Sequence, residues 1–353
     1  MKAKIYINGI SSISAQNLDF EENPVSYHKI IFPAISPNYK EFIKPMALRR
    51  MSKAIKMGIT SAKVALNEAK IEIPDAIITG TGEGCKQDTE RFLENLIDQD
   101  EELLSPTSFI QSTHNTIGGQ IALNLGCKNY NVTYTQNSAS LESALLDAEM
   151  QLLETSENKS VLVGGVDELS EKITQFRTLD GQLKSVDIHN LDLLKEDSTG
   201  TITSEGSHFF TLSTEKNNKS YAEFIDVSIK NSIQPEKIND EVEIFLNKNN
   251  ISSAAAIDVV ILGNNGDNRY DHYYKNLQQN LFKNTAQLAY KHLVGDYDTV
   301  SGFAIYSACK ILKSGRIPVV MKRNASTAKE LKNILIYNQY LGRDHSLILL
   351  SAV

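Results

Sequence analysis

Residues 131–153 read NVTYTQNSASLESALLDAEMQLL, and the pattern changes in the middle of this stretch. The first part is rich in β-branched and aromatic residues, which is typical of a strand. Apolar residues then recur at the spacing of one helix face: Leu141, Ala144, Leu145, Ala148 and Leu152. The stretch therefore predicts a strand, a sharp turn and a helix.

The turn between this strand and this helix is the first candidate site. In several enzyme classes such a turn holds a nucleophile, because the helix dipole and free backbone N–H groups lower a thiol pKa or stabilise an oxyanion. The turn here offers Gln136, Asn137, Ser138 and Ser140, and none of them is a cysteine.

Composition and net charge limit the classes of function and partner that this chain can have. With 353 residues, 41% of them hydrophobic, the chain can bury a large core. A net charge of -7 argues against a nucleic-acid partner, because phosphate recognition needs a concentrated basic face. The main exception is a basic cluster of Lys44, Arg49, Arg50, Lys53 and Lys56. It is either the solvated face of an amphipathic helix or a surface for an acidic partner.

Cysteine usage and hydropathy indicate the compartment. Cys85, Cys127 and Cys309 are odd in number and far apart, which fits free thiols in a reducing compartment. Their spacing suggests no metal site, and nothing else in the sequence points to a cofactor. No apolar run approaches the roughly 20 residues of a membrane span, and the start has no long apolar segment. We therefore expect a cytoplasmic protein without a membrane span.

Strands and helices alternate along the whole chain. The expected strands are 4–13, 75–84, 131–135, 160–165, 207–213, 221–229, 257–263, 316–321, 333–337 and 346–353, the last as an edge or hairpin strand. The expected helices are 47–69, 113–125, 141–153, 241–248 and 299–313. One order of elements appears about twice, which predicts an α/β fold with two similar halves, 1–217 and 218–353. The polar segment at about 174–201 is expected to be a surface insertion.

Several short motifs occur in an order that is similar to one family. They are Arg49-Arg50-Met51-Ser52, Gly164-Gly165-Val166-Asp167-Glu168, Ser204-Glu205-Gly206-Ser207 and Tyr221-Ala222-Glu223. Together with the strand-turn-helix at 131–153, they resemble the β-ketoacyl synthases of the thiolase fold, nearly from end to end. The resemblance implies a thiolase-like fold with layered α-β-α-β-α architecture.

The family's catalytic residues carry over only in part. The nucleophilic cysteine falls at Asn137, whose carboxamide cannot hold an acyl chain as a thioester. The first family histidine falls at Leu262 or Gly263, whereas the other family histidine corresponds to His292. Enolate stabilisation in the family needs two imidazoles, or an imidazole and an amide, and one histidine is a poor substitute. Condensation by this chain alone is therefore not expected. The resemblance implies a substrate pocket of Gln136, Asn137, Ser138, His292, Tyr340 and Leu341.

These losses make the chain resemble a chain length factor, a ketosynthase-like subunit without the nucleophile. The resemblance implies an active ketosynthase as heterodimer partner, with an acyl carrier protein, in polyketide, polyene or fatty acid biosynthesis. The implied dimer interface contains Asn115, Gln120, Tyr130, Val132 and Tyr134. Two alternatives remain: a standalone acyl-thioester enzyme using Ser138 and His292, and a homodimeric protein that binds acyl chains or carrier protein without chemistry.

Overall fold

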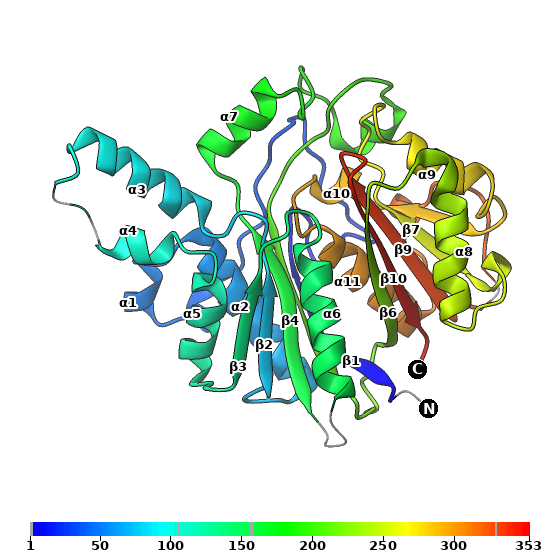
Figure 1. Cartoon of the computed structure of the whole chain (residues 1–353), viewed down its shortest axis with the longest axis horizontal. Helices are drawn as coiled ribbons and strands as arrows, with labels where there is room; N and C mark the ends of the chain where they lie inside the picture. Colours follow the sequence, from blue (N-terminus) through cyan, green and yellow to red (C-terminus); the bar gives the residue numbers. More distant parts are fainter. Residues whose placement is uncertain (1–2, 103, 105, 155–158, 329) are drawn as a thin grey trace.

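The structure is a computed structural model that describes residues 3–102, 104, 106–154, 159–328 and 330–353. Its strands up to the middle of the chain are β1 (Ile5–Ile13), β2 (Ala76–Gly80), β3 (Tyr130–Tyr134), β4 (Ser160–Asp167) and β5 (Gly206–Ser213). The later strands are β6 (Ala222–Asn231), β7 (Val259–Leu262), β8 (Ala286–Ala289), β9 (Asn333–Tyr340) and β10 (Asp344–Ser351). They form a ten-stranded sheet (Figure 1).

The order of the strands repeats with inverted direction across the middle of the sheet. It runs β3-β2-β4-β5-β1-β6-β10-β9-β7-β8, so each strand of the first half has a counterpart in the second. The parallel and antiparallel pairings match as well. β1 and β6 join the halves through a short stretch in which Ile5, Tyr6 and Ile7 pair with β6. The two similar halves are confirmed, while the exact boundary at 217/218 stays a prediction.

Helices cover the outer faces of the sheet and form a layer between its two halves. The long helices are α2 (Lys53–Ala69), α3 (Lys86–Asp98), α5 (Thr116–Leu125), α6 (Ser140–Leu153), α8 (Ile238–Lys248) and α11 (Ser301–Ser314). The shorter ones are α1 (Pro45–Leu48), α4 (Pro106–Gln111), α7 (Glu171–Leu179), α9 (His272–Gln279) and α10 (Lys291–Val294). Single 3-10 turns are η1 (Tyr39–Glu41), η2 (Asn190–Lys195), η3 (Pro235–Lys237), η4 (Ala254–Ala256) and η5 (Val319–Met321).

The central layer consists of α6 and α11. α6 contacts β2 and β4 of its own half and β6 of the other, while α11 contacts β9 and β10 as well as β1 and β5. Their apolar faces lie in one core cluster that includes Leu141, Leu145, Phe303 and Ile305. α2 and α5 pack on the outer face of the first half, and α8 and α9 on that of the second. The predicted thiolase-like architecture is confirmed.

Three local expectations need correction. The predicted helix 47–69 is interrupted, because Ser52 caps α2 by accepting a hydrogen bond from the Ile55 N–H at 3.2 Å. The predicted strand 316–321 is not a strand: residues 319–321 form the 3-10 turn η5, and Pro318 just before it has no N–H to give to a ladder. The last strand is a hairpin partner of β9, but it lies inside the sheet between β6 and β9.

The segment 174–201 is more than a surface loop. It includes most of α7 and all of η2, and it buries Lys184, Asn190 and Leu193. The Lys184 ammonium donates hydrogen bonds to Ser198 and, at 2.7 Å, to the carbonyl of Gly266. The insertion is therefore anchored to the second half.

Within the described part of the chain, no helix combines the length and the apolar character needed to cross a membrane. The cytoplasmic location stays a prediction.

Candidate functional site

The turn before α6 keeps the strained geometry of a nucleophile turn. Asn137 has a φ of 47°, in the left-handed region that asparagine tolerates better than most residues. The Ser140 hydroxyl fixes the turn. Its oxygen accepts a hydrogen bond from the Gln136 N–H at 2.8 Å, and its single proton is shared between the carbonyl oxygens of Asn137 at 2.6 Å and Thr81 at 3.0 Å. A Cβ on Gly80 would lie 2.6 Å from the Ser140 backbone, so only glycine lets β2 approach the helix start this closely.

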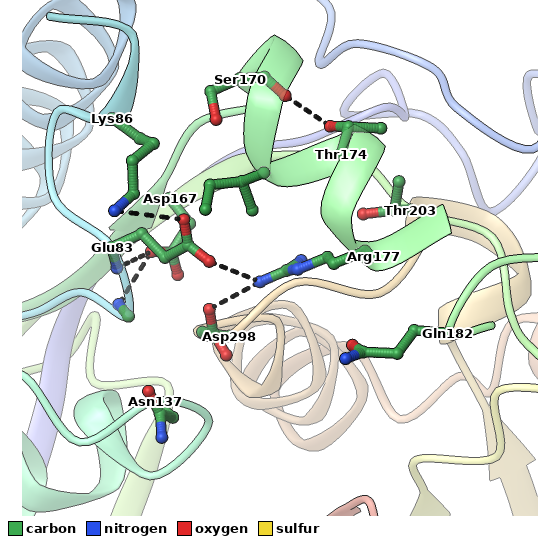
Figure 2. Close-up of polar contacts among 12 residues, drawn as sticks. Glu83, Lys86, Asn137, Asp167, Ser170, Thr174, Arg177, Gln182, Thr203 and Asp298 are labelled. Atoms are coloured by element: carbon green, nitrogen blue, oxygen red, sulfur yellow. Dashed lines mark hydrogen bonds and ion pairs between the residues drawn. The ribbon is translucent and has the colours of Figure 1, made fainter. Parts of the chain in front are cut away.

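The side chain of Asn137 borders a cleft of about 340 Å³. The cleft lies between the loop after β2, helix α7 and the start of α11 (Figure 2). Its lining residues are Glu83, Asn137, Ile173, Phe176, Arg177, Asp180, Gln182, Asp298 and Tyr340. None of these is a cysteine or a histidine.

Arg177 crosses the cleft and binds two carboxylates. Its Nη2 lies 3.0 Å from Glu83 Oε1 and 3.1 Å from Asp298 Oδ2 (Figure 2). Burial disfavours the charged guanidinium, but the neighbouring carboxylates, Asp298 first, more than offset this and raise the pKa of Arg177. Lys86 adds an ion pair to Glu83 at 3.8 Å. The cleft thus holds paired charges beside the turn, and none of its lining residues carries a thiol or an imidazole.

Asp167 forms hydrogen bonds with two of the segments that border the cleft. Its Oδ1 accepts hydrogen bonds from the Thr81 hydroxyl and the Gly82 N–H, and its Oδ2 accepts one from the Thr299 N–H at 2.9 Å. Burial, and next the charge of Asp298, raise the pKa of Asp167 to about 7. Through these bonds Asp167 ties the loop after β2 to the start of α11. Among the described residues, no group of three or more His, Cys, Asp or Glu is placed to hold a metal ion.

The structure brings only part of the predicted pocket together. Asn137 and Tyr340 line the cleft, and the Tyr340 hydroxyl donates to Gln182 Oε1 at 3.1 Å. Gln136 is exposed but does not line the cleft, and Leu341 lies at the tip of the β9–β10 hairpin with a φ of 50°.

The two residues proposed for a standalone enzyme do not line the cleft either. Ser138 is only 6% exposed. His292 is 2% exposed, and its Nε2 lies 3.1 Å from the carbonyl oxygen of Val320. Burial lowers the pKa of His292 to about 4, which suits a neutral ring within the core.

Gly263, one of the two candidate positions of the missing first histidine, has no room for a side chain. A Cβ on Gly263 would lie 2.3 Å from Asn338 Oδ1 and 2.8 Å from the Tyr274 hydroxyl. Leu262, the other candidate position, is fully buried in the core of the second half. Packing therefore excludes an imidazole at Gly263 unless these neighbours move.

Comparison with known proteins agrees with this geometry. Residues 27–183 match the family model described as β-ketoacyl synthase, N-terminal domain. The whole chain superposes on the whole of a chain in the ishigamide ketosynthase/chain length factor structure, with a TM-score of 0.79 and 15% identity. The fold is that of the ketosynthases.

Two further ketosynthase-fold structures are of the same kind. One is a complex of the ketosynthase ApeO with its chain length factor ApeC from Xenorhabdus doucetiae, with a TM-score of 0.78, 15% identity and coverage of 99% of this chain and 98% of that chain. The other is the AntDE:AntF complex of a type II polyketide synthase carrier protein with its ketosynthase, with a TM-score of 0.79, 12% identity and full coverage of both chains. A search of curated proteins finds no match.

Sequence reasoning missed the charged residues of this ketosynthase-fold site. Glu83 follows a buried strand in a glycine-rich loop, and Asp298 stands in an otherwise buried stretch that ends at α11. Asp296 and Asp298, two acidic residues close together just before the predicted helix 299–313, were the available signal. Arg177 gave none, because it lies in a polar segment that is typical of a surface loop.

The predicted interface residues surround the free edge of the sheet. β3 pairs only with β2, so its other edge has no strand partner among the described residues. Tyr130 is exposed, while Val132 and Tyr134 are half-buried on the same strand. Asn115 is exposed just before α5, and Gln120 is half-buried on that helix, which contacts β3.

Proposed function

We propose that this chain is a catalytically degenerate subunit of the chain-length-factor type, which pairs with a cysteine-bearing ketosynthase. The observation that carries the proposal is the cleft beside Asn137. It retains the turn of a nucleophile but presents a carboxamide and the Arg177 ion pairs in place of a thiol and imidazoles. Such a set cannot form an acyl thioester.

The exposed surface around β3 supports a heterodimer. Leu123 on α5 is 76% exposed, and Leu146 and Met150 on α6 are 42% and 52% exposed. Both helices contact β3, so these apolar side chains flank its free edge. Strand pairing across such an edge would add backbone hydrogen bonds to the burial of this apolar surface.

An arm made of α3 and α4 extends from the body at the same end as β3 (Figure 1). Phe109 and Ile110 on α4 are more than half exposed, as is Ile97 on α3. An apolar arm beside a free sheet edge suits insertion into a partner subunit, where it would help to shape the acyl pocket.

The charge of the basic cluster supports binding of the carrier protein at this surface. Arg49, Arg50, Lys53 and Lys56 line a surface hollow of about 490 Å³ together with Arg91 of α3. Arg49 and Arg50 are exposed, whereas Lys53 forms an ion pair with Glu205. An acidic acyl carrier protein complements this hollow in charge.

The test is co-expression with a cysteine-bearing ketosynthase from the same organism, followed by size-exclusion chromatography with light scattering. We expect a one-to-one heterodimer that elongates an acyl carrier thioester, whereas this chain alone does not. The double variant Leu146→Arg and Met150→Arg should prevent pairing, because it places charges beside β3. The matched control Val319→Arg, at a 77% exposed position on η5, should pair normally.

Two outcomes would contradict the proposal. Elongation of the thioester by the purified chain alone would show that it is a complete enzyme. A stable homodimer that does not exchange subunits with the ketosynthase would indicate a binding protein without chemistry.

A further inference from the structure

A second cavity lies beside β1 and shares no lining residue with the Asn137 cleft. It has a volume of about 360 Å³, within the range of small-molecule sites. β1 pairs with β6 only as far as Ile7, and beyond Gly9 it continues alongside β5 alone. The cavity occupies the space that opens where β6 leaves β1, with Tyr221 at the entrance to β6 in its wall.

Helices α2 and α11 each line this cavity with residues from one side of the helix. Thr60, Val64 and Glu68 follow one another at four-residue spacing on α2, so they lie on one side of that helix. Tyr306 and Lys310 have the same spacing on α11. The other lining residues, apart from Tyr221, are six apolar ones, Ile10, Ile13, Leu18, Ile35, Pro37 and Phe42, and five polar ones, Ser11, Ser12, Ser14, Gln16 and Asn17.

The two charged side chains of the cavity wall, Glu68 and Lys310, already have polar contacts. Glu68 Oε2 accepts a hydrogen bond from the Ile10 N–H at 3.0 Å, and the Tyr221 hydroxyl also interacts with this carboxylate. The Lys310 ammonium lies 2.9 Å from Glu21 Oε1 and donates to the carbonyl of Leu18 at 3.1 Å. A charged ligand would therefore have to compete with these contacts for either group.

Thr60 is a buried polar residue of the cavity wall. Its side chain lines the cavity, is only 2% exposed, and its hydroxyl has no hydrogen-bond partner within the described part of the chain. A buried hydroxyl without a partner costs about 1–3 kcal/mol. A ligand atom that bonds to this hydroxyl would recover that cost.

We propose that this cavity binds a small, largely apolar molecule with one uncharged hydroxyl or carbonyl group, which bonds to Thr60. The apolar walls take up the body of the ligand, and the Thr60 hydroxyl selects its polar head. The site is separate from the Asn137 cleft and does not depend on the proposed pairing with a ketosynthase.

The first experiment compares three probes by isothermal titration calorimetry on the full chain: octan-1-ol, octanoate and octylamine. We expect saturable binding of octan-1-ol and at least tenfold weaker binding of the two charged probes. Thr60→Val should weaken octan-1-ol binding by about three- to tenfold and raise the melting temperature of the free protein, because it removes the unpaired hydroxyl. Thr107→Val, at an exposed position, is the matched control and should change neither quantity.

The second experiment fills the cavity from either wall. Val64→Trp and Ile35→Trp should each abolish octan-1-ol binding, and using both keeps the test valid if one of them fails to fold. Val186→Trp, at a 66% exposed position, should bind as the unchanged protein does. The proposal would be overturned by the absence of saturable octan-1-ol binding, by binding that survives both tryptophan variants, or by tighter binding of octanoate or octylamine.

Discussion

Arg177 Nη2 lies 3.1 Å from Asp298 Oδ2, and this ion pair joins residues 121 positions apart in the chain. Arg177 belongs to α7 and Asp298 directly precedes the central helix α11. The pair therefore connects the polar insertion to the second half of the fold, across the cleft that Asn137 borders. Because Asp298 is only 5% exposed, its charge depends on this contact.

Removal of the guanidinium should destabilise the protein. Arg177→Met leaves the Asp298 carboxylate buried without its main partner, and we expect a loss of about 3 kcal/mol in the free energy of unfolding. Chemical denaturation at neutral pH measures this loss. Lys332→Met, which breaks an exposed ion pair with Glu330, is the matched control and should have no measurable effect.

Direct coupling between these two charges should also give a result that a loss of packing alone would not give. In the double variant Arg177→Met with Asp298→Asn, the loss should be smaller than the sum of the two single losses, because neither charge remains unpaired. Strict additivity of the single effects would contradict a direct coupling between the two side chains.

Restoring a thiol should not restore condensation. Asn137→Cys places an exposed sulfhydryl at the turn, so we expect alkylation by iodoacetamide, detected as one additional adduct by intact mass relative to the unchanged protein. No elongated product should form from an acyl carrier thioester, because neither Leu262 nor Gly263 supplies the imidazole that enolate stabilisation would need. Product formation by this variant alone would show that the cleft still contains working condensation machinery.

The backbone at Asn137 should tolerate glycine but not a β-branched residue. Its φ of 47° costs most residues roughly 1–2 kcal/mol, so Asn137→Val should lower the free energy of unfolding by about that amount and Asn137→Gly should change it little. Thermal unfolding compares the two with Asn17→Val, in an exposed loop without positive φ. Equal effects of the three substitutions would argue against strain at the turn.

Local pattern predicted nine of the ten strands of the described sheet and five of the six long helices named above. It missed β8, α3 and most of the short helices, and it gave no information on distant contacts. The strand and helix expected within 131–153 are β3 and α6, because alternation and helical spacing are properties of neighbouring residues. The motif order also indicated the ketosynthase fold. The strand 316–321 failed at Pro318, a signal that the sequence did contain. The Arg177 contacts were not predictable, since they depend on how α7 folds back over the cleft.

The same limit explains the outcome for the predicted pocket. Asn137 was found because its neighbours in sequence define the turn, and it does line the cleft. His292 was selected by a motif, yet its ring is buried against Val320 and does not line the cleft. A short motif gives the position of a residue in the chain, but the direction of its side chain depends on packing from elsewhere.

Glu142 should make the protein less stable as the pH rises toward 8. Its side chain is fully buried on α6. The Oε1 atom accepts a hydrogen bond from the Ser346 hydroxyl at 3.0 Å, whereas Oε2 has no hydrogen-bond partner among the residues described. Ser301, Lys291 and Tyr290 also face this carboxyl group. Burial raises its pKa from 4.5 to about 7, so its contribution to stability is complete below about pH 4.5 and is lost as the pH rises through 7. We expect Glu142→Gln to reduce the fall in unfolding free energy between pH 5 and pH 8 by on the order of 1–3 kcal/mol, measured by denaturation at each pH. Glu22→Gln, at an exposed position, should leave the pH profile unchanged, and an unaltered profile in Glu142→Gln would show that Glu142 is not the group that titrates.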